Sequence, residues 1–90
     1  MTNRYEVELS KRAANELRKL DRRAQERLLK ALVLLRENPR PPVVKSLSGH
    51  PGYLRVRVGE YRIVYTVDDG KLIVLVLTVG HRPGIYDALP

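Results

Sequence analysis

The amino-acid sequence predicts a small α+β domain, in which a first strand and a two-helix hairpin precede an antiparallel β-meander. Three observations predict this fold. Apolar residues alternate with charged residues at the start of the chain, they recur at helical spacing over residues 11–37, and three β-rich runs follow residue 52. Because 90 residues with 43% hydrophobic content can bury one modest core, we expect residues 1–90 to form a single domain.

The first strand is predicted by a period of two near the N-terminus. Tyr5, Val7 and Leu9 alternate with charged residues, which is typical of a strand that buries one face. Ser10 is a predicted N-cap, and from Lys11 the spacing becomes that of a short amphipathic helix. This helix is expected to bury Ala13, Leu17 and Leu20 and to expose Arg12, Glu16 and Lys19.

The second helix is predicted to begin after Asp21, which can cap it, and to end at Asn38 and Pro39. Its apolar stripe comprises Ala24, Leu28, Ala31, Leu32 and Leu35. Prolines and glycines restrain the segment 39–52, so we expect a long loop there with Leu47 as its anchor.

Three β-rich runs cover residues 53–58, 61–67 and 72–79, and turn residues separate them. Short turns favour an antiparallel meander. The last run is apolar at every position from Leu72 to Leu77, which predicts an interior strand that is covered on both faces.

The first hairpin of the meander carries the main candidate site. If Gly59 and Glu60 form a type II′ turn, Arg57 lies opposite Arg62, and Arg55 shares their face. Like charges opposite each other on neighbouring strands destabilise a sheet, so this arrangement favours a polyanionic ligand. The alternative, that Glu60, Asp68 or a helix carboxylate neutralises the three arginines, remains open at this point.

Composition narrows the classes of function. Seventeen Lys and Arg against ten Asp and Glu give a net charge of +7, which favours nucleic acid or an acidic partner, although a basic surface can also serve solubility alone. The absence of cysteine excludes disulfides, thiolate metal sites and cysteine nucleophiles. Without a signal-peptide pattern or a long apolar run, we expect a cytoplasmic protein that does not associate with membranes.

A second cluster follows the last predicted strand, where His81, Arg82 and Tyr86 lie close together in the sequence. A lone histidine is more often a surface residue, and a tyrosine near a terminus is more often a docking aromatic. Their proximity to an arginine makes all three candidate site residues.

The segments YLRVRVGEYRIVY (residues 53–65) and VGHR (79–82), followed by Tyr86, resemble the RelE/ParE toxin superfamily, and the likeness spans nearly the whole chain. Within the superfamily the RelE branch is favoured. The resemblance implies a RelE-like fold and a toxin of a type II toxin–antitoxin system. It also implies a ribosome-dependent endonuclease that cuts mRNA in the A site through attack by a ribose 2′-OH, without metal or cofactor.

The same resemblance implies residue roles. Arg62 matches the arginine that stabilises the phosphate, and Arg82 the arginine near the leaving group. Where the family pattern has a lysine pair on the second strand, this chain has arginines, which hold their protons too strongly to act as a base. Proton transfer is therefore assigned to Tyr86 or His81, and RNA binding to Arg55, Arg57 and Lys45.

The implied partners are a cognate RelB-like antitoxin, mRNA and the ribosome, which the toxin would enter at the A site. Two other functions stay open. One is a ParE-type inhibitor of DNA gyrase, which needs no catalytic group. The other is a protein that binds RNA or stalls ribosomes without hydrolysis.

Overall fold

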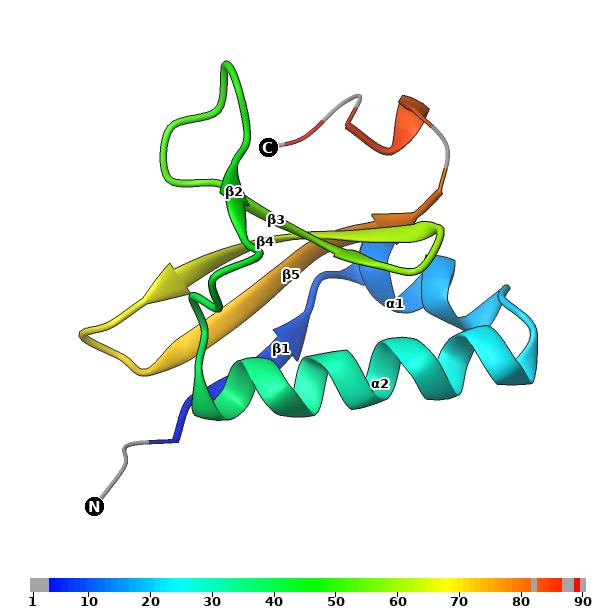
Figure 1. Ribbon diagram of the computed structural model, residues 1–90, viewed down its shortest axis with the longest axis horizontal. Coiled ribbons are helices and arrows are strands. Elements are labelled where there is room, and N and C mark those ends of the chain that lie inside the picture. Colours follow the sequence, from blue (N-terminus) through cyan, green and yellow to red (C-terminus); the bar gives the residue numbers. More distant parts are fainter. Residues whose placement is uncertain (1–3, 82, 87–88, 90) are drawn as a thin grey trace.

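The computed structural model describes residues 4–81, 83–86 and 89, and it forms one sheet with both α-helices on the same side (Figure 1). In chain order the elements are β1 Glu6–Leu9, α1 Lys11–Arg18, α2 Arg22–Glu37, β2 Lys45–Ser46, β3 Leu54–Val58, β4 Tyr61–Asp68, β5 Ile73–Gly80 and the 3-10 helix η1 Pro83–Tyr86. The α+β prediction is confirmed.

Both helices begin at the residues that the sequence predicts. The Ser10 side chain accepts a hydrogen bond from the backbone N–H of Ala13 at 3.0 Å, and Asp21 accepts one from Ala24 at 3.2 Å. These bonds satisfy backbone donors that the first turn of a helix leaves without partners.

No helix of the described segments is long and apolar enough to cross a membrane.

The strand order in the sheet is β1-β5-β4-β3-β2, with β1 parallel to β5 and the other neighbours antiparallel. The predicted meander and the interior position of β5 are therefore confirmed. The long loop predicted over residues 39–52 contains the short strand β2, which the sequence did not predict. Two residues are too short for a periodic pattern, and β2 exists only through its pairing with β3.

The main core fills the space between the helices and the sheet. Leu28, Leu32 and Leu35 of the predicted α2 stripe are buried there, Leu28 completely, and Ala31 is partly buried. They pack in one cluster with residues such as Ile63 and Val76. The prediction that Leu9 is buried was wrong, since its side chain is 37% exposed. Leu9 ends the edge strand β1, where it borders a hollow shared with α2 instead of entering the core.

A smaller apolar cluster lies on the opposite face of the sheet. Leu47, Val64 and Leu77 form its buried centre, and Tyr86 and Leu89 pack against it. Leu47 is the loop anchor that the sequence predicts. In Figure 1 the segment around η1 and the loop between β2 and β3 rise on this side, away from the helices. This face is called the outer face below.

Candidate nucleic-acid interface

The β3–β4 hairpin has the predicted register. Arg57 lies opposite Arg62, and Val56 lies opposite Ile63. Gly59 has a φ of 61°, as the first position of a type II′ turn requires. Glu60, at the second position, has a negative φ, because the one non-glycine residue with a positive φ among the described residues is Leu72.

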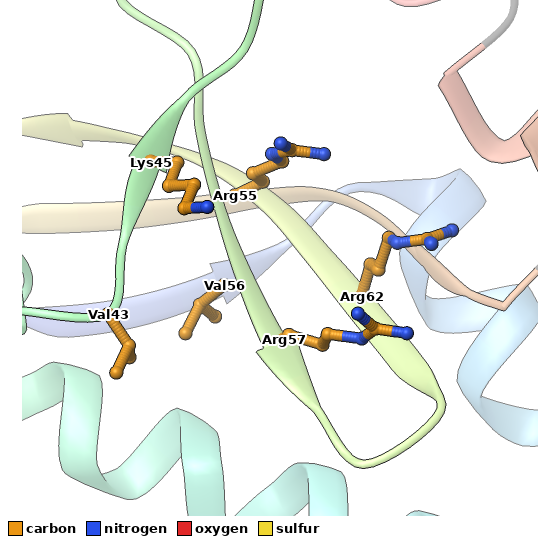
Figure 2. Close-up of a pocket in the computed structure, with 6 residues that line it drawn as sticks. All are labelled: Val43, Lys45, Arg55, Val56, Arg57 and Arg62. Carbon is orange, nitrogen blue, oxygen red and sulfur yellow. The ribbon is translucent and has the colours of Figure 1, made fainter.

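This register separates the two faces of the hairpin. Val56, Val58 and Ile63 pack toward the helices, and the three arginines lie on the outer face. A pocket of about 140 Å³ opens here, lined by Val43, Lys45, Arg55, Val56, Arg57 and Arg62. Figure 2 shows that Val43 and Val56 point toward α2, while Lys45 and Arg55 lie side by side on the other side of the strands. The structure thus brings together four of the predicted site residues.

The cationic side chains of the pocket lie opposite one another on neighbouring strands, and not opposite carboxylates. Lys45 lies directly opposite Arg55, and Arg57 directly opposite Arg62, which makes two like-charge pairs across strands. Each pair costs roughly 0.2–1 kcal/mol relative to a neutral pair. Such a surface favours binding of an anion with several charges.

The acidic residues of the described segments do not neutralise this group. The ion pairs there are Arg4–Glu37, Arg12–Glu16, Arg22–Glu26 and Arg40–Asp69. Asp68 instead accepts a hydrogen bond from the backbone N–H of Lys71. The alternative that Glu60, Asp68 or a helix carboxylate neutralises the arginines is therefore wrong for the described residues.

Tyr86 lies on the same face as the arginines. It belongs to η1, packs on the outer apolar cluster, and its hydroxyl oxygen lies 3.5 Å from Nη1 of Arg55, which donates to it. A phenol is thereby held at the border of the cationic pocket.

His81 is oriented differently. Its ring makes an edge-on contact with the ring of Tyr61, with 5.3 Å between ring centroids, and Tyr61 packs against the helix-side core. Gly80 is the residue of β5 that lies opposite Arg62. His81 therefore turns away from the arginine face, and Arg82 lies outside the described residues.

The C-terminal end of β5 is held by Glu16, a residue that sequence reasoning missed. Its Oε1 accepts hydrogen bonds from Thr78 Oγ1 at 2.6 Å and from the backbone N–H of Val79 at 3.1 Å. The prediction that Glu16 faces water was wrong, because β1 ends before this part of β5 and α1 takes its place at the edge. Helical periodicity alone carries no signal for such a contact.

One wall of the pocket is formed by the loop after α2, which is fixed at two points. The hydroxyl of Tyr65 donates to the carbonyl of Pro39 at 2.7 Å, and burial raises the pKa of Tyr65 to about 12. Arg40 makes two hydrogen bonds of 3.0 Å to Asp69, which also accepts one from Tyr5. The bond from Arg40, followed by that from Tyr5, lowers the pKa of Asp69.

The fold and the cationic hairpin are those expected of a toxin of the RelE/ParE superfamily, and comparison with known proteins gives the same family. Residues 7–86 match the family described as ParE toxin of type II toxin-antitoxin system, parDE. The mRNA interferase toxin RelE of Escherichia coli is 40% identical over 80 residues, which are 87% of this chain and 83% of the relative.

Solved structures agree with the sequence comparison. The RelBE2 toxin–antitoxin complex of Mycobacterium tuberculosis has a TM-score of 0.78 and 32% identity, covering 88% of this chain and 99% of that chain. The intact RelBE complex of E. coli has a TM-score of 0.77 and 36% identity, covering 87% and 96%. A mutant E. coli RelE in complex with an antitoxin RelBc peptide has a TM-score of 0.74 and 37% identity, covering 91% and 85%.

These similarities identify the chain as a toxin of a type II toxin–antitoxin system. It belongs to the RelE/ParE toxin superfamily, and it is RelE-like.

Proposed function

We propose that this toxin is an endoribonuclease that cuts mRNA in the ribosomal A site. The observation that carries the proposal is the pocket at which Lys45, Arg55, Arg57 and Arg62 meet without a carboxylate among the described residues. The RelE relative at 40% identity is named an mRNA interferase, which supports RNA as the substrate and disfavours the gyrase-inhibitor alternative. A RelB-like antitoxin is the partner that the related complexes support.

The proposed reaction needs no group beyond the chain and the RNA. The ribose 2′-oxygen attacks the adjacent phosphorus and loses its proton, the bond from phosphorus to the 5′-oxygen breaks, and that oxygen gains a proton. The products are a 2′,3′-cyclic phosphate and a 5′-hydroxyl. Negative charge grows on the phosphate in the transition state, where fixed guanidinium groups stabilise it more strongly than in the ground state.

We assign the roles that the family resemblance implies. Arg62 stabilises the pentacoordinate phosphate, and Arg82, which lies outside the described residues, acts at the leaving oxygen. Lys45, Arg55 and Arg57 bind the flanking phosphates. Of the two candidates for proton transfer, Tyr86 is supported by its place beside Arg55, whereas His81 contacts Tyr61.

The test is mRNA cleavage in a reconstituted translation system. Arg62→Ala and Arg82→Ala, each checked for folding by circular dichroism, should lose most of the activity. Lys71→Ala is the charge-matched control, because Lys71 lies in the turn between β4 and β5, at the other end of the sheet (Figure 1). Tyr86→Phe should then lose more activity than His81→Gln.

Each contrary outcome selects another function. Intact mRNA together with arrested growth would refute the nuclease proposal and make gyrase supercoiling the next assay. Tight ribosome binding without cleavage would indicate a stalling protein.

A further inference from the structure

An aromatic pair lies in the loop between β2 and β3. The rings of His50 and Tyr53 are stacked, with 5.4 Å between their centroids and 22° between their planes. The imidazole of His50 makes no hydrogen bond within the described part of the chain, so the stacking contact with Tyr53 orients its ring. Neither residue has a role in the reaction proposed above.

The loop that carries the pair is closed by its own backbone. The N–H of His50 donates to the carbonyl of Leu47 at 3.2 Å, and the N–H of Tyr53 donates to the carbonyl of His50 at 3.0 Å. Gly49 and Gly52 have φ values of 79° and 82°, and a Cβ at either position would meet nothing within 4 Å, so glycine serves the backbone conformation there. A loop fixed in this way holds both rings in place before a ligand binds, which lowers the entropic cost of binding.

Tyr53 continues the row of cations on β3. The N–H of Leu47 donates to the carbonyl of Tyr53 at 2.9 Å, which extends the ladder in which Lys45 lies opposite Arg55. Because Tyr53 and Arg55 are two positions apart on an extended backbone, their side chains lie on the same face. Tyr53 accordingly packs on the outer apolar cluster, as does Tyr86, whose hydroxyl lies 3.5 Å from Arg55. The outer face therefore carries an aromatic pair directly beyond the arginines.

Cations and aromatic rings in one row suit a single strand of RNA. Cations bind the phosphates, and aromatic side chains give the unpaired bases a surface for stacking. The stack also stabilises the loop, but the backbone hydrogen bonds and the buried side chain of Leu47 already close it. The half-exposed rings of His50 and Tyr53 are therefore available to a ligand on the cationic face.

We propose that His50 and Tyr53 form a stacking platform for one base of the mRNA strand whose phosphates lie along Arg55 and Arg57. The base stacks on the face of the imidazole that turns away from Tyr53, which gives the order base, imidazole, phenol. The inference rests on the proposed function, since it takes RNA as the ligand. It adds a base-binding subsite at a distance from the phosphate that Arg62 stabilises.

The test measures the binding of a short single-stranded 2′-O-methyl oligonucleotide by fluorescence anisotropy at low salt, without ribosomes. This probe has no free 2′-hydroxyl, so the toxin cannot cut it. An abasic residue replaces each nucleotide in turn. At one position the missing base should weaken binding by wild type roughly 5- to 100-fold. With His50→Ala the same abasic residue should have no effect, because its stacking partner is already absent.

Three variants control this comparison. His50→Phe should keep the sensitivity to the abasic residue, because it keeps a ring, and Tyr53→Leu should reduce it. Tyr5→Leu replaces a tyrosine that packs on the helix-side core and donates to Asp69, and it should change affinity less than about twofold. Circular dichroism checks the folding of each variant.

The platform proposal fails if wild type is equally tolerant of every abasic residue, if His50→Ala is as sensitive as wild type, or if the oligonucleotide does not bind. Because this assay needs no cleavage, an inactive toxin in the translation system would refute the nuclease proposal and leave the platform standing. On programmed ribosomes His50→Ala should cut intact mRNA more slowly than wild type, and mRNA with the abasic residue equally fast. A defect of His50→Ala that persists on the abasic mRNA would indicate a base of ribosomal RNA and overturn the assignment to mRNA.

Discussion

The arginine pair of the hairpin should lower the stability of the folded chain. Arg57 and Arg62 lie directly opposite each other, and the described residues supply neither with an ion pair. Replacing Arg57 with Gln removes one like charge and keeps a polar side chain of similar length. From the cost of a like-charge cross-strand pair, we expect a gain of about 0.5 kcal/mol in the free energy of unfolding at low salt.

For a chain of this size that gain raises Tm by about 2–4 °C, which differential scanning calorimetry resolves. Salt should abolish it, because the Debye length falls from about 10 Å at 0.1 M to about 3 Å at 1 M. Lys71→Gln is the control, since with a net charge of +7 the loss of any cation relieves some general repulsion. The gain specific to the pair is the difference between the two variants.

The same substitution should weaken mRNA cleavage, so that stability rises while activity falls. A rise in stability together with a fall in cleavage activity indicates that the arginine serves ligand binding and not folding. A lower Tm for Arg57→Gln than for Lys71→Gln at low salt would refute the reasoning, because it would mean that the guanidinium has a stabilising partner within the fold. An equal gain at both salt concentrations would also refute an electrostatic cause.

Three further predictions concern the groups that hold the site in place. Glu16→Ala should cost about 3 kcal/mol in urea unfolding, because two donors of β5 lose their acceptor, and Glu16→Gln should cost clearly less because it keeps an oxygen acceptor. Tyr65→Phe should cost about 1 kcal/mol at pH 7 for its lost bond to Pro39. Since the folded pKa of Tyr65 is raised to about 12 from 10.0, the wild type should lose stability as the pH rises from 10 to 12, and unfolding titrations should show that Tyr65→Phe lacks this loss. The pKa of Asp69 is lowered from 3.8 in the folded chain, so its ion pair with Arg40 stabilises the fold above that pH. The difference in urea midpoint between wild type and Asp69→Asn should therefore vanish as the pH falls below 3.8.

The hairpin could be predicted from the sequence because a two-residue turn determines which residues lie opposite each other. Once Gly59 and Glu60 are assigned to the turn, the alternation of side chains places Arg55, Arg57 and Arg62 on one face, as the structure confirms. Local rules likewise identified both helix caps, since a cap depends on residues only three positions apart.

Contacts between distant elements could not be predicted in this way. Glu16 fits the polar side of an amphipathic helix, and its role depends on β1 being too short to cover the end of β5. The pairing of Lys45 with Arg55 depends on where a long loop returns to the sheet. Both contacts depend on how distant elements pack together, and the periodicity of residues within one segment carries no information about that packing.

The orientation of His81 depends on one extra residue in β5. Counting from the turn between β4 and β5, an unbroken register would place Val79 opposite Arg62 and turn His81 toward the arginine face. The structure has a bulge at Leu77, so Gly80 lies opposite Arg62 and Val79 enters the main core. His81 therefore meets Tyr61 on the helix side, and Tyr86 is the phenol that lies beside Arg55. A run that is apolar at every position gives no sign of such a bulge, because neither face differs from the other, so the sequence alone could not show on which face of the sheet His81 lies.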